Sequence, residues 1–512
     1  MAVAFQQVAV DVGSGAAAAL AEGGHVLPVL DGLDEIPPPA RAQVIAALNA
    51  SLTARDQLIL TSRRKEFTTA IHETGRPLTA AAVIVPKPIT PQAAADYLTA
   101  CLPSSPTDAW RQTLAALRSR TAPGLTRLTA TPLALWLIRT VYIAPGADPI
   151  PLTGPLGADA DADVLRTHLL DHVIPALIQA RPPSTDPAHH FRPRRVRDPD
   201  ATRRHLTYLA RAFPPATTRD TTWWHIARTT PHIRSTVLLV FGIAFGIWFG
   251  ATRTIAFGLA MGLVITFGIA SWLVRASSWV NEKPGYADLR LRGRTSFLFR
   301  SIKGTLAFGL TIGFVSGLTI AFVSGLTIAF VSMFTVDLDR GVYLDSEFDF
   351  DAGFGFGIAL WLGITLASGL ITWAEQPTLA STSTPRSSWR ADRALSLLRM
   401  VVTGLVTGLV FGPGIGIVLV FGPWEGLVPG LTIGLVFGLG AGLVMGNHHA
   451  WLVCTIAVAR LAIQRRLPWR VMDFLDDAHR LGLLRAVGPV HQFRHAALHD
   501  HLSANDKSGG AS

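Results

Sequence analysis

Charged residues are scarce in this chain. Asp, Glu, Lys and Arg make up 16% of its 512 residues, whereas about a quarter is usual for a soluble domain. The mean hydropathy is +0.36, so we expect much of the chain to lie in a lipid bilayer. Cysteine is also rare. Cys101 and Cys454 are the only two, which excludes a disulfide framework and a cysteine-based zinc site. Residues 1–20 lack a basic start and a sustained apolar run, so no secretory signal peptide is predicted.

Long apolar runs take the place of the missing charge. A helix needs about 20 apolar residues to cross a bilayer, and we predict six membrane spans, at 236–252, 254–274, 304–334, 353–374, 400–421 and 426–446. No Asp, Glu, Lys or His lies in the middle of a span, which argues against a proton-coupled pump. Glycines recur every four residues in three of the spans, for example Gly404, Gly408, Gly412 and Gly416, and such stripes let helices pack closely. The sequence therefore predicts a polytopic α-helical membrane domain.

The loops between these spans differ in charge. Basic residues gather in loops 275–303 and 375–399, and acidic residues gather in loop 335–352. Because basic loops stay on the cytoplasmic side, six spans place both termini in the cytosol. The net charge of +10 is then explained by contact with lipid, and no specific nucleic-acid partner is predicted. We expect a multi-pass protein of the cell membrane.

An acidic cluster follows an apolar run near the N-terminus. Residues 26–37 read Val-Leu-Pro-Val-Leu-Asp-Gly-Leu-Asp-Glu-Ile-Pro, which is typical of a buried strand with carboxylates at its C-terminal end. Open α/β sheets bind ligands at that edge, and carboxylates there can hold Mg²⁺ beside a triphosphate. We therefore expect Asp31 to hold Mg²⁺ through water, and Asp34 and Glu35 to polarise an attacking water molecule.

A second apolar strand is predicted shortly after the first. Residues 41–52 have the apolar spacing of a helix, and residues 57–64 form an apolar run that ends in Ser-Arg-Arg. This strand–helix–strand unit places Arg63 at the same sheet edge as Asp31. A cation there can stabilise the charge of a γ-phosphate.

The chain resembles NACHT domains, which are signalling NTPases of the STAND class. Segments 27–37 and 58–67 are similar to the Walker B and sensor 1 segments of that family, and segment 83–91 resembles the strand that follows them. Segment 130–135 resembles the family's adenine-contacting region, and segment 493–502 resembles the motif that ends its winged-helix region. The resemblance implies an α/β P-loop-NTPase-like fold, with Pro132 against the adenine and His495 at the β-phosphate of ADP.

One element of that family is absent from this sequence. The phosphate loop Gly-x-x-x-x-Gly-Lys-Ser/Thr, whose backbone N–H groups and lysine hold the phosphates, occurs nowhere in the chain. We therefore expect weak or no binding of ATP and ADP, and ATP hydrolysis only if such a loop precedes residue 1. The chain is expected to be either an N-terminal truncation or a degenerate relative.

These patterns divide the chain into four regions. We expect a partial NACHT-like nucleotide-binding domain over 1–142, a helical linker region over 143–234, the membrane domain over 235–459, and a small winged-helix-like C-terminal unit with a tail over 460–512. Phe493 to Leu502 is predicted to be a helix. His491, His495 and His499 recur every four residues, so they would share one helix face, although no carboxylate or cysteine completes a metal site.

The predicted function is nucleotide-dependent signalling at a membrane. The resemblance implies a switch from a closed ADP state to an assembling ATP state, with self-association and an unidentified protein trigger. Two alternatives stay open at this point. One is a multipass channel or transporter with a vestigial cytosolic domain, and the other is a non-functional fragment.

Overall fold

The computed structural model divides the chain into two compact units, residues 1–136 with 149–162 and residues 137–148 with 163–512. The structure describes residues 19–20, 25, 27–52, 56–154, 161–233, 235–236, 279, 281–285, 294–334, 346–375, 384–418 and 448–504. The predicted spans at 254–274 and 426–446, and all of the span at 236–252 except Thr236, lie outside these residues.

The first unit begins with two short parallel strands joined by a helix. Its elements are β1 (Val29–Leu30), the 3₁₀ turn η1 (Leu33–Glu35), α3 (Pro38–Ser51), β2 (Ile59–Leu60) and α4 (Arg64–Thr74). Strand β1 pairs with β2 in parallel, which confirms the predicted strand–helix–strand unit. Its core is formed by Leu33, Ile45 and Ala70, with Leu60 and Phe67 packed against them. The apolar faces of α3 and α4 are therefore buried against this small sheet.

Short helices form the rest of the first unit. They are α5 (Pro91–Cys101), α6 (Asp108–Ser119), α7 (Pro123–Leu128), α8 (Pro132–Ile138) and the 3₁₀ turn η3 (Ile150–Leu152). Thr90 and Thr107 cap the N-termini of α5 and α6, each by accepting a backbone N–H bond, as is common for threonine before a first helical turn. The π-helix η2 (Arg139–Ile143) continues α8 into the second unit.

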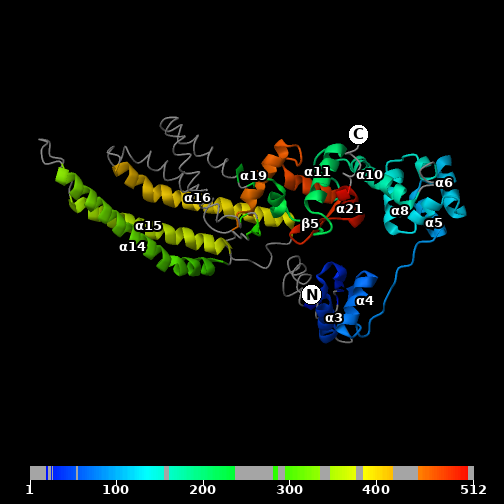
Figure 1. Cartoon of the computed structure of the whole chain (residues 1–512), viewed down its shortest axis with the longest axis horizontal. Helices are drawn as coiled ribbons and strands as arrows, with labels where there is room; N and C mark the ends of the chain where they lie inside the picture. The colour runs from blue at the N-terminus through cyan, green and yellow to red at the C-terminus, as the bar shows by residue number, and fades with distance from the viewer. Residues whose placement is uncertain are drawn as a thin grey trace. The chain divides into compact units, whose positions relative to one another are not determined.

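Three long helices dominate the second unit (Figure 1). They are α14 (Thr295–Phe334), α15 (Ser346–Glu375) and α16 (Pro385–Val418), and α15 contacts both of the others. The predicted spans at 304–334 and 353–374 lie within α14 and α15, and α16 contains the described part of the span at 400–421. Helices α14 and α16 extend beyond their predicted spans into the basic loops, whereas α15 begins seven residues before its predicted span, within the acidic loop.

Glycines bring α14 and α15 into direct backbone contact. A Cβ added to Gly313 would lie 2.5 Å from the carbonyl oxygen of Gly357, and one added to Gly369 would lie 2.7 Å from Cα of Ile302. The contacts run in opposite directions along the two helices, so the pair is antiparallel. Gly309 and Gly313 are four residues apart on one helix, as expected for a small-residue packing stripe. The packing stripes predicted from the sequence contain other glycines, of which Gly404 and Gly408 are buried in α16.

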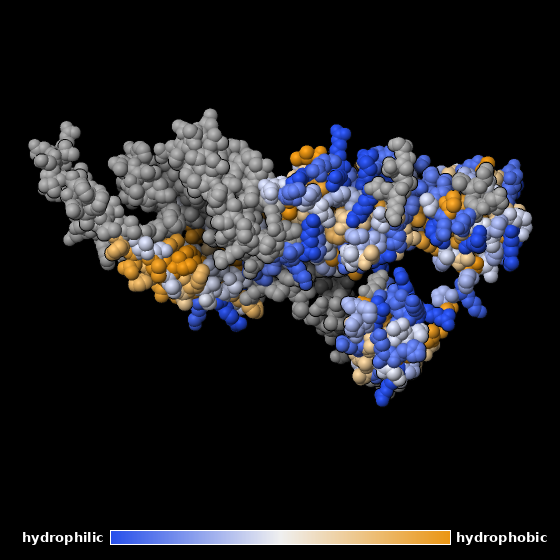
Figure 2. Space-filling view, in the orientation of Figure 1, coloured by the Kyte–Doolittle hydropathy of each residue, from blue (hydrophilic) through white to orange (hydrophobic). Residues whose placement is uncertain are grey.

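Apolar side chains cover the outer surface of these helices. Figure 2 shows an apolar surface over α14 and α15, and its exposed residues include Phe308, Phe314, Leu318, Phe322 and Leu366. Within the described residues, the segments Thr295–Thr319 and Gly357–Glu375 are long and apolar enough to cross a membrane. Length and composition alone are weak evidence, since core helices of soluble proteins also meet this test. In an apolar stretch of 18 residues within each of these segments, only 17% and 39% of the stretch is buried within the protein.

The remaining elements of the second unit precede or follow the long helices in the sequence. Those before are α10 (Ala162–Ala180), α11 (Pro199–Ala212), β3 (Asp220–Thr221) and the 3₁₀ helix η4 (Trp223–Thr229). Those after are α19 (Ala450–Ile463), α20 (Val471–Arg480), β4 (Leu484–Val487), β5 (Val490–Phe493) and α21 (Ala496–Ala504). We call residues 163–233 and 448–504 together the split domain.

One antiparallel sheet joins the two halves of the split domain. Its strand order is β3-β5-β4, with Asp220 opposite Gln492 and Thr221 opposite His491. Helix α11 packs on α21 and α19 packs on η4. The thiol of Cys454 donates to the carbonyl oxygen of Trp223 at 3.2 Å. The regions 143–234 and 460–512 were predicted to be separate, and most of α19 was predicted to belong to the membrane domain. In the structure, residues 163–233 and 448–504 share one sheet and pack together.

The C-terminal helix begins later than predicted. Phe493 ends strand β5, and α21 starts at Ala496. Gly488, with a φ of 55°, forms a tight turn between β4 and β5, a conformation that glycine adopts at little cost. His491 therefore lies on a strand, His495 lies between strand and helix, and only His499 is helical. The predicted shared helix face of the three histidines is wrong.

Candidate functional site

The carboxyl ends of β1 and β2 bring three of the predicted site residues together. The Thr61 amide donates to the carbonyl oxygen of Leu30, and the Leu33 amide donates to that of Thr61, at 2.9 and 3.0 Å. These bonds fix the turns after both strands at one edge of the sheet. Asp31, Asp34 and Arg63 lie at this edge, as the sequence predicted. We call Asp31, Asp34, Thr61 and Arg63 the edge cluster.

Threonine 61 orders the first carboxylate of the edge cluster. Its hydroxyl donates to Oδ1 of Asp31, and its oxygen accepts the Gly32 amide at 3.0 Å. Gly32 has a φ of 81°, which turns the chain sharply between strand and 3₁₀ turn. Asp31 remains exposed to solvent. Thr61 was not among the predicted site residues, although the sequence shows a hydroxyl residue directly after the second strand.

The second carboxylate is paired with the predicted cation. Oδ2 of Asp34 lies 3.2 Å from Nε of Arg63, and Oδ1 accepts the Arg63 amide at 3.2 Å. The Asp34 side chain is 15% exposed and that of Arg63 is 68% exposed. Arg41 donates to the backbone oxygens of Asp34 and Ile36, which holds the turn against α3. Asp34 thus positions Arg63, and both its oxygens are already engaged.

Strands β1 and β2 are more exposed to solvent than predicted. Val29 is 58% exposed and Ile59 is 47% exposed, so one face of the two-stranded sheet is open. Helices α3 and α4 cover only the other face, since their core residues pack against Leu60. Val83, Ile84 and Val85 were expected to form a strand, but they are irregular and exposed. The expectation of fully buried strands is therefore wrong for this edge.

The other predicted residues lie on other elements. Glu35 ends η1 in the same turn as Asp34, Pro132 begins α8, and His495 follows β5 in the second unit. Burial lowers the pKa of His495, and the positive charges of Arg494 and Arg485 lower it further. At neutral pH His495 is therefore an uncharged imidazole, a weaker donor to phosphate than an imidazolium would be.

The edge cluster fits a metal–nucleotide ligand only in part. Mg²⁺ binds through one or two carboxylates and the phosphates of its substrate, and Asp31 can supply one such carboxylate. Asp34 is already engaged by Arg63, and the described residues contain no group of three His, Cys, Asp or Glu side chains that could hold a metal ion. Nothing in the edge cluster replaces the missing phosphate loop. The residues present therefore do not complete a Mg²⁺–triphosphate site.

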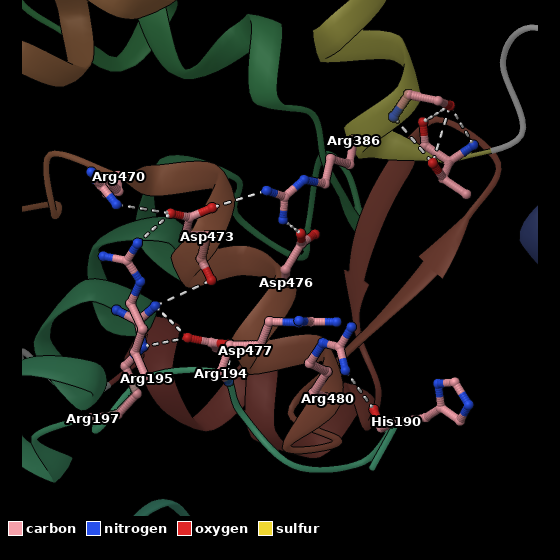
Figure 3. Close-up of polar contacts among 12 residues, drawn as sticks. His190, Arg194, Arg195, Arg197, Arg386, Arg470, Asp473, Asp476, Asp477 and Arg480 are labelled. Carbon is pink, nitrogen blue, oxygen red and sulfur yellow. Dashed lines mark hydrogen bonds and ion pairs between the residues drawn. The ribbon is translucent and has the colours of Figure 1, made fainter. Parts of the chain in front are cut away.

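A second polar cluster, not predicted from the sequence, surrounds α20 (Figure 3). Asp477 is 3% exposed and accepts the Arg194 amide and Nε of Arg197, each at 2.8 Å. Asp473 and Asp476 lie further out on α20, and both accept hydrogen bonds from Arg386 in the first turn of α16. We call Asp473, Asp476 and Asp477 the acidic face of α20. The Asp-Phe-Leu-Asp-Asp spacing was visible in the sequence, but its arginine partners were not.

The end of α16 nearest the split domain holds one more buried acid. Asp392 is fully buried and accepts the amides of Gly285 and Trp451, each at 2.6 Å. Burial raises the pKa of Asp392 to about 6, although these two hydrogen bonds oppose the shift. Nearby, His449 contacts Glu282 at 3.1 Å and stacks on Trp279. These contacts connect loop 281–285 and α16 to α19.

Comparison with known proteins gives no relative for this chain. No protein-family model, no curated protein and no solved structure matches it.

Proposed function

We propose that this chain is a membrane-anchored, nucleotide-responsive switch protein that resembles NACHT signalling proteins. In this proposal the first unit responds to a nucleotide, and the split domain transmits the response to the membrane helices. The observation that carries the proposal is the contact of Arg386, in the first turn of α16, with Asp473 and Asp476 on α20. It joins a long apolar helix directly to the polar split domain.

Helix surfaces support the membrane half of the proposal. The exposed faces of α14 and α15 are apolar, a surface of a kind that marks contact with lipid or protein. Polar contacts gather at one end of the bundle, where Arg294 donates to the Trp373 carbonyl oxygen and Arg399 pairs with Glu375. That end belongs to the two basic loops that we expect in the cytosol.

Helix and strand order supports a winged-helix role for the split domain. Helix α20 precedes the β4–β5 hairpin, and β3 completes the three-stranded sheet. The apolar helices enter the sequence between β3 and α19, so this domain is interrupted, with the membrane region inserted into it. A displacement of α16 would therefore act on the split domain through the contact of Arg386 with α20.

The edge cluster supports a sensing role more than a catalytic one. The Asp31 carboxylate can bind the metal ion of a metal-bound nucleotide. Arg63 pairs with Asp34 and is placed where it could contact a phosphate. Glu35 and Pro132, in the same unit, remain the proposed further contacts of water and adenine. Because the phosphate-holding loop is missing from the sequence, we expect weak ATP or ADP binding with no turnover.

Cysteine labelling tests the membrane half. We would introduce Ser346→Cys or Arg390→Cys into a chain carrying Cys101→Ser, because Cys454 is buried and Cys101 is partly exposed. Whole cells are then treated with a membrane-impermeant maleimide. We expect labelling at position 346, which belongs to the predicted acidic loop 335–352, and none at the exposed position 390. Labelling at 390 alone, or extraction of the protein by alkaline carbonate, would refute the membrane arrangement.

Hydrogen exchange tests the transmission. ADP added to the full chain in lipid nanodiscs should change the exchange rates of the first turns of α16. Arg386→Gln should abolish that response, whereas Arg390→Gln should keep it, because Arg390 is exposed and carries the same charge on the same helix. Absence of any ADP effect on α16 in the unaltered chain would refute a nucleotide switch. Loss of the response in both variants would refute the role of Arg386.

A further inference from the structure

A basic pocket of about 590 Å³ lies in the split domain. One wall is the face of α11 that carries Arg203, Arg204, Thr207, Tyr208, Arg211 and Ala212. The other walls are Thr229 at the end of η4 and the pair Arg465–Arg466 just after α19. We call this the arginine pocket. Its volume is within the range of small-molecule sites.

Positive charge dominates the arginine pocket. Five of its nine lining residues are arginines, and none is acidic. Arg203 is neutralised from outside the pocket by Asp171, which also contacts His501 at 2.8 Å. For Arg204, Arg465 and Arg466, the described part of the chain contains no ion-pair partner, and all three side chains are exposed. Like charges that line one pocket repel one another, so a bound anion would stabilise the arrangement.

Uncharged donors line the same wall. The hydroxyls of Tyr208 and Thr229 lie 2.8 Å apart. The Thr229 hydroxyl donates to the carbonyl oxygen of Ile226 at 2.7 Å, so Tyr208 is the donor in this contact and orders the wall. Burial raises the pKa of Tyr208. Thr207 adds a further hydroxyl on the same face of α11. Arginine forks with neutral hydroxyl donors form the donor set that recognises phosphate oxygens.

The arginine pocket adjoins the point where the chain leaves the split domain. Thr229 lines it, and the first predicted membrane span begins at Thr236. Arg460 in α19 donates to the Thr236 hydroxyl, and Arg465 and Arg466 follow the end of the same helix. A ligand held between α11 and Arg465–Arg466 would therefore link α11 to the end of α19, the helix that contacts Thr236.

We propose that the arginine pocket binds a phosphate-bearing anion, a phosphomonoester or diphosphate. The phosphate lies between Arg204 and the Arg465–Arg466 pair, and the hydroxyl of Thr207 donates to it. Two sources supply this chemistry, a phosphomonoester lipid headgroup and a soluble phosphate compound. The proposal does not depend on nucleotide binding in the first unit.

Inorganic pyrophosphate is the probe for this site. It is titrated into the purified full chain, in micelles of uncharged detergent, by isothermal titration calorimetry. The test variant is the triple change Arg204→Gln, Arg465→Gln and Arg466→Gln. The control is Arg76→Gln, Arg127→Gln and Arg192→Gln, which removes the same charge from exposed arginines outside the pocket. We expect saturable binding that the test variant weakens at least about tenfold and the control leaves unchanged, because charge-assisted bonds to phosphate are among the strongest polar contacts.

The melting temperature of ligand-free protein separates binding from folding. The three arginines changed in the test variant are exposed, so we expect the variant and the unaltered chain to have the same melting temperature. If it does not, the single change Arg465→Gln replaces it, with Arg192→Gln as its control. Absence of saturable pyrophosphate binding, or equal weakening in test and control variants, would overturn the proposal.

Nanodiscs distinguish the two sources. Phosphatidylcholine discs are doped with phosphatidic acid, a phosphomonoester, or with phosphatidylglycerol, a phosphodiester. If the natural ligand is a headgroup, phosphatidic acid should compete with pyrophosphate more strongly than phosphatidylglycerol does. Equal pyrophosphate affinity in both discs, with the arginine dependence retained, identifies a soluble phosphate compound.

Discussion

Asp477 is the residue whose loss should cost the split domain most. Its side chain is 4% exposed and pairs with Arg197, which is 15% exposed. It also accepts the Arg194 amide at 2.8 Å. In Asp477→Ala the Arg197 guanidinium stays buried against Phe474 without its counter-charge. Breaking a buried ion pair by removing one partner costs about 3–5 kcal/mol.

A neighbouring acid on the same helix provides the comparison. The Asp473 side chain is 26% exposed, and its partners Arg386, Arg195 and Arg470 are 39%, 48% and 67% exposed. Solvent screens such pairs, which typically contribute about 0–1 kcal/mol each. We therefore expect Asp473→Ala to destabilise the split domain far less than Asp477→Ala, although both changes remove one carboxylate from α20.

Urea unfolding of the full chain measures the free energy of unfolding of each variant. Hydrogen exchange in residues 471–480 shows whether the loss of stability lies in α20. The double variant Arg197→Met, Asp477→Leu should recover most of the stability, because apolar residues of similar volume can replace a buried ion pair. If Asp477→Ala costs no more than Asp473→Ala, the buried pair does not hold α20 in place and the reasoning fails.

Three further predictions concern buried groups elsewhere. Because burial raises the pKa of Asp392 from 3.8 to about 6, the folded state binds its proton more tightly than the unfolded chain; stability should fall by about 3 kcal/mol as pH rises from about 4 to about 6.5, and an unfolding series in which Asp392→Asn keeps the full fall would contradict this. Gly313→Ala should lower the free energy of unfolding by about 1–3 kcal/mol, since its Cβ would overlap α15. Gly304→Ala, which meets no atom within 4 Å, should raise it by up to about 1 kcal/mol, and equal effects on thermal unfolding would exclude close helix packing as the cause. Burial raises the pKa of Cys454 to about 12, so iodoacetamide should modify Cys101 in the folded protein and spare Cys454, as peptide mass spectrometry can show.

Local pattern predicted the edge cluster well. An apolar run followed by Asp31 and Asp34, a helix, and a second apolar run before Arg63 were enough to place these side chains at one sheet edge. Parallel strands separated by a helix must present their carboxyl ends on the same side. The open face of that sheet was not predictable, because the exposure of Val29 and Ile59 depends on which other segments pack there.

Helical periodicity failed at the C-terminus for a definite reason. The spacing of His491, His495 and His499 fits a helix, but the glycine turn at Gly488 makes a hairpin. Pairing of β5 with β3 then holds His491 in an extended conformation. His499 is buried, donates to the Phe213 carbonyl oxygen at 2.8 Å and stacks on Phe493. Its role in the split domain is therefore structural.

The sequence by itself determined the long apolar helices, the charge asymmetry of their loops and the strand–helix–strand unit. Each of these follows from residues close together in the chain, whose spacing selects a local conformation and one buried face. Only the tertiary structure decided the split domain, the acidic face of α20 and the arginine pocket. Asp220 contacts Gln492, Arg386 contacts Asp476, and Arg204 lines one pocket with Arg465, and in each case the two residues are far apart in the chain. Such contacts form when distant segments pack together and desolvate the same surface, and no local spacing records which segments these will be.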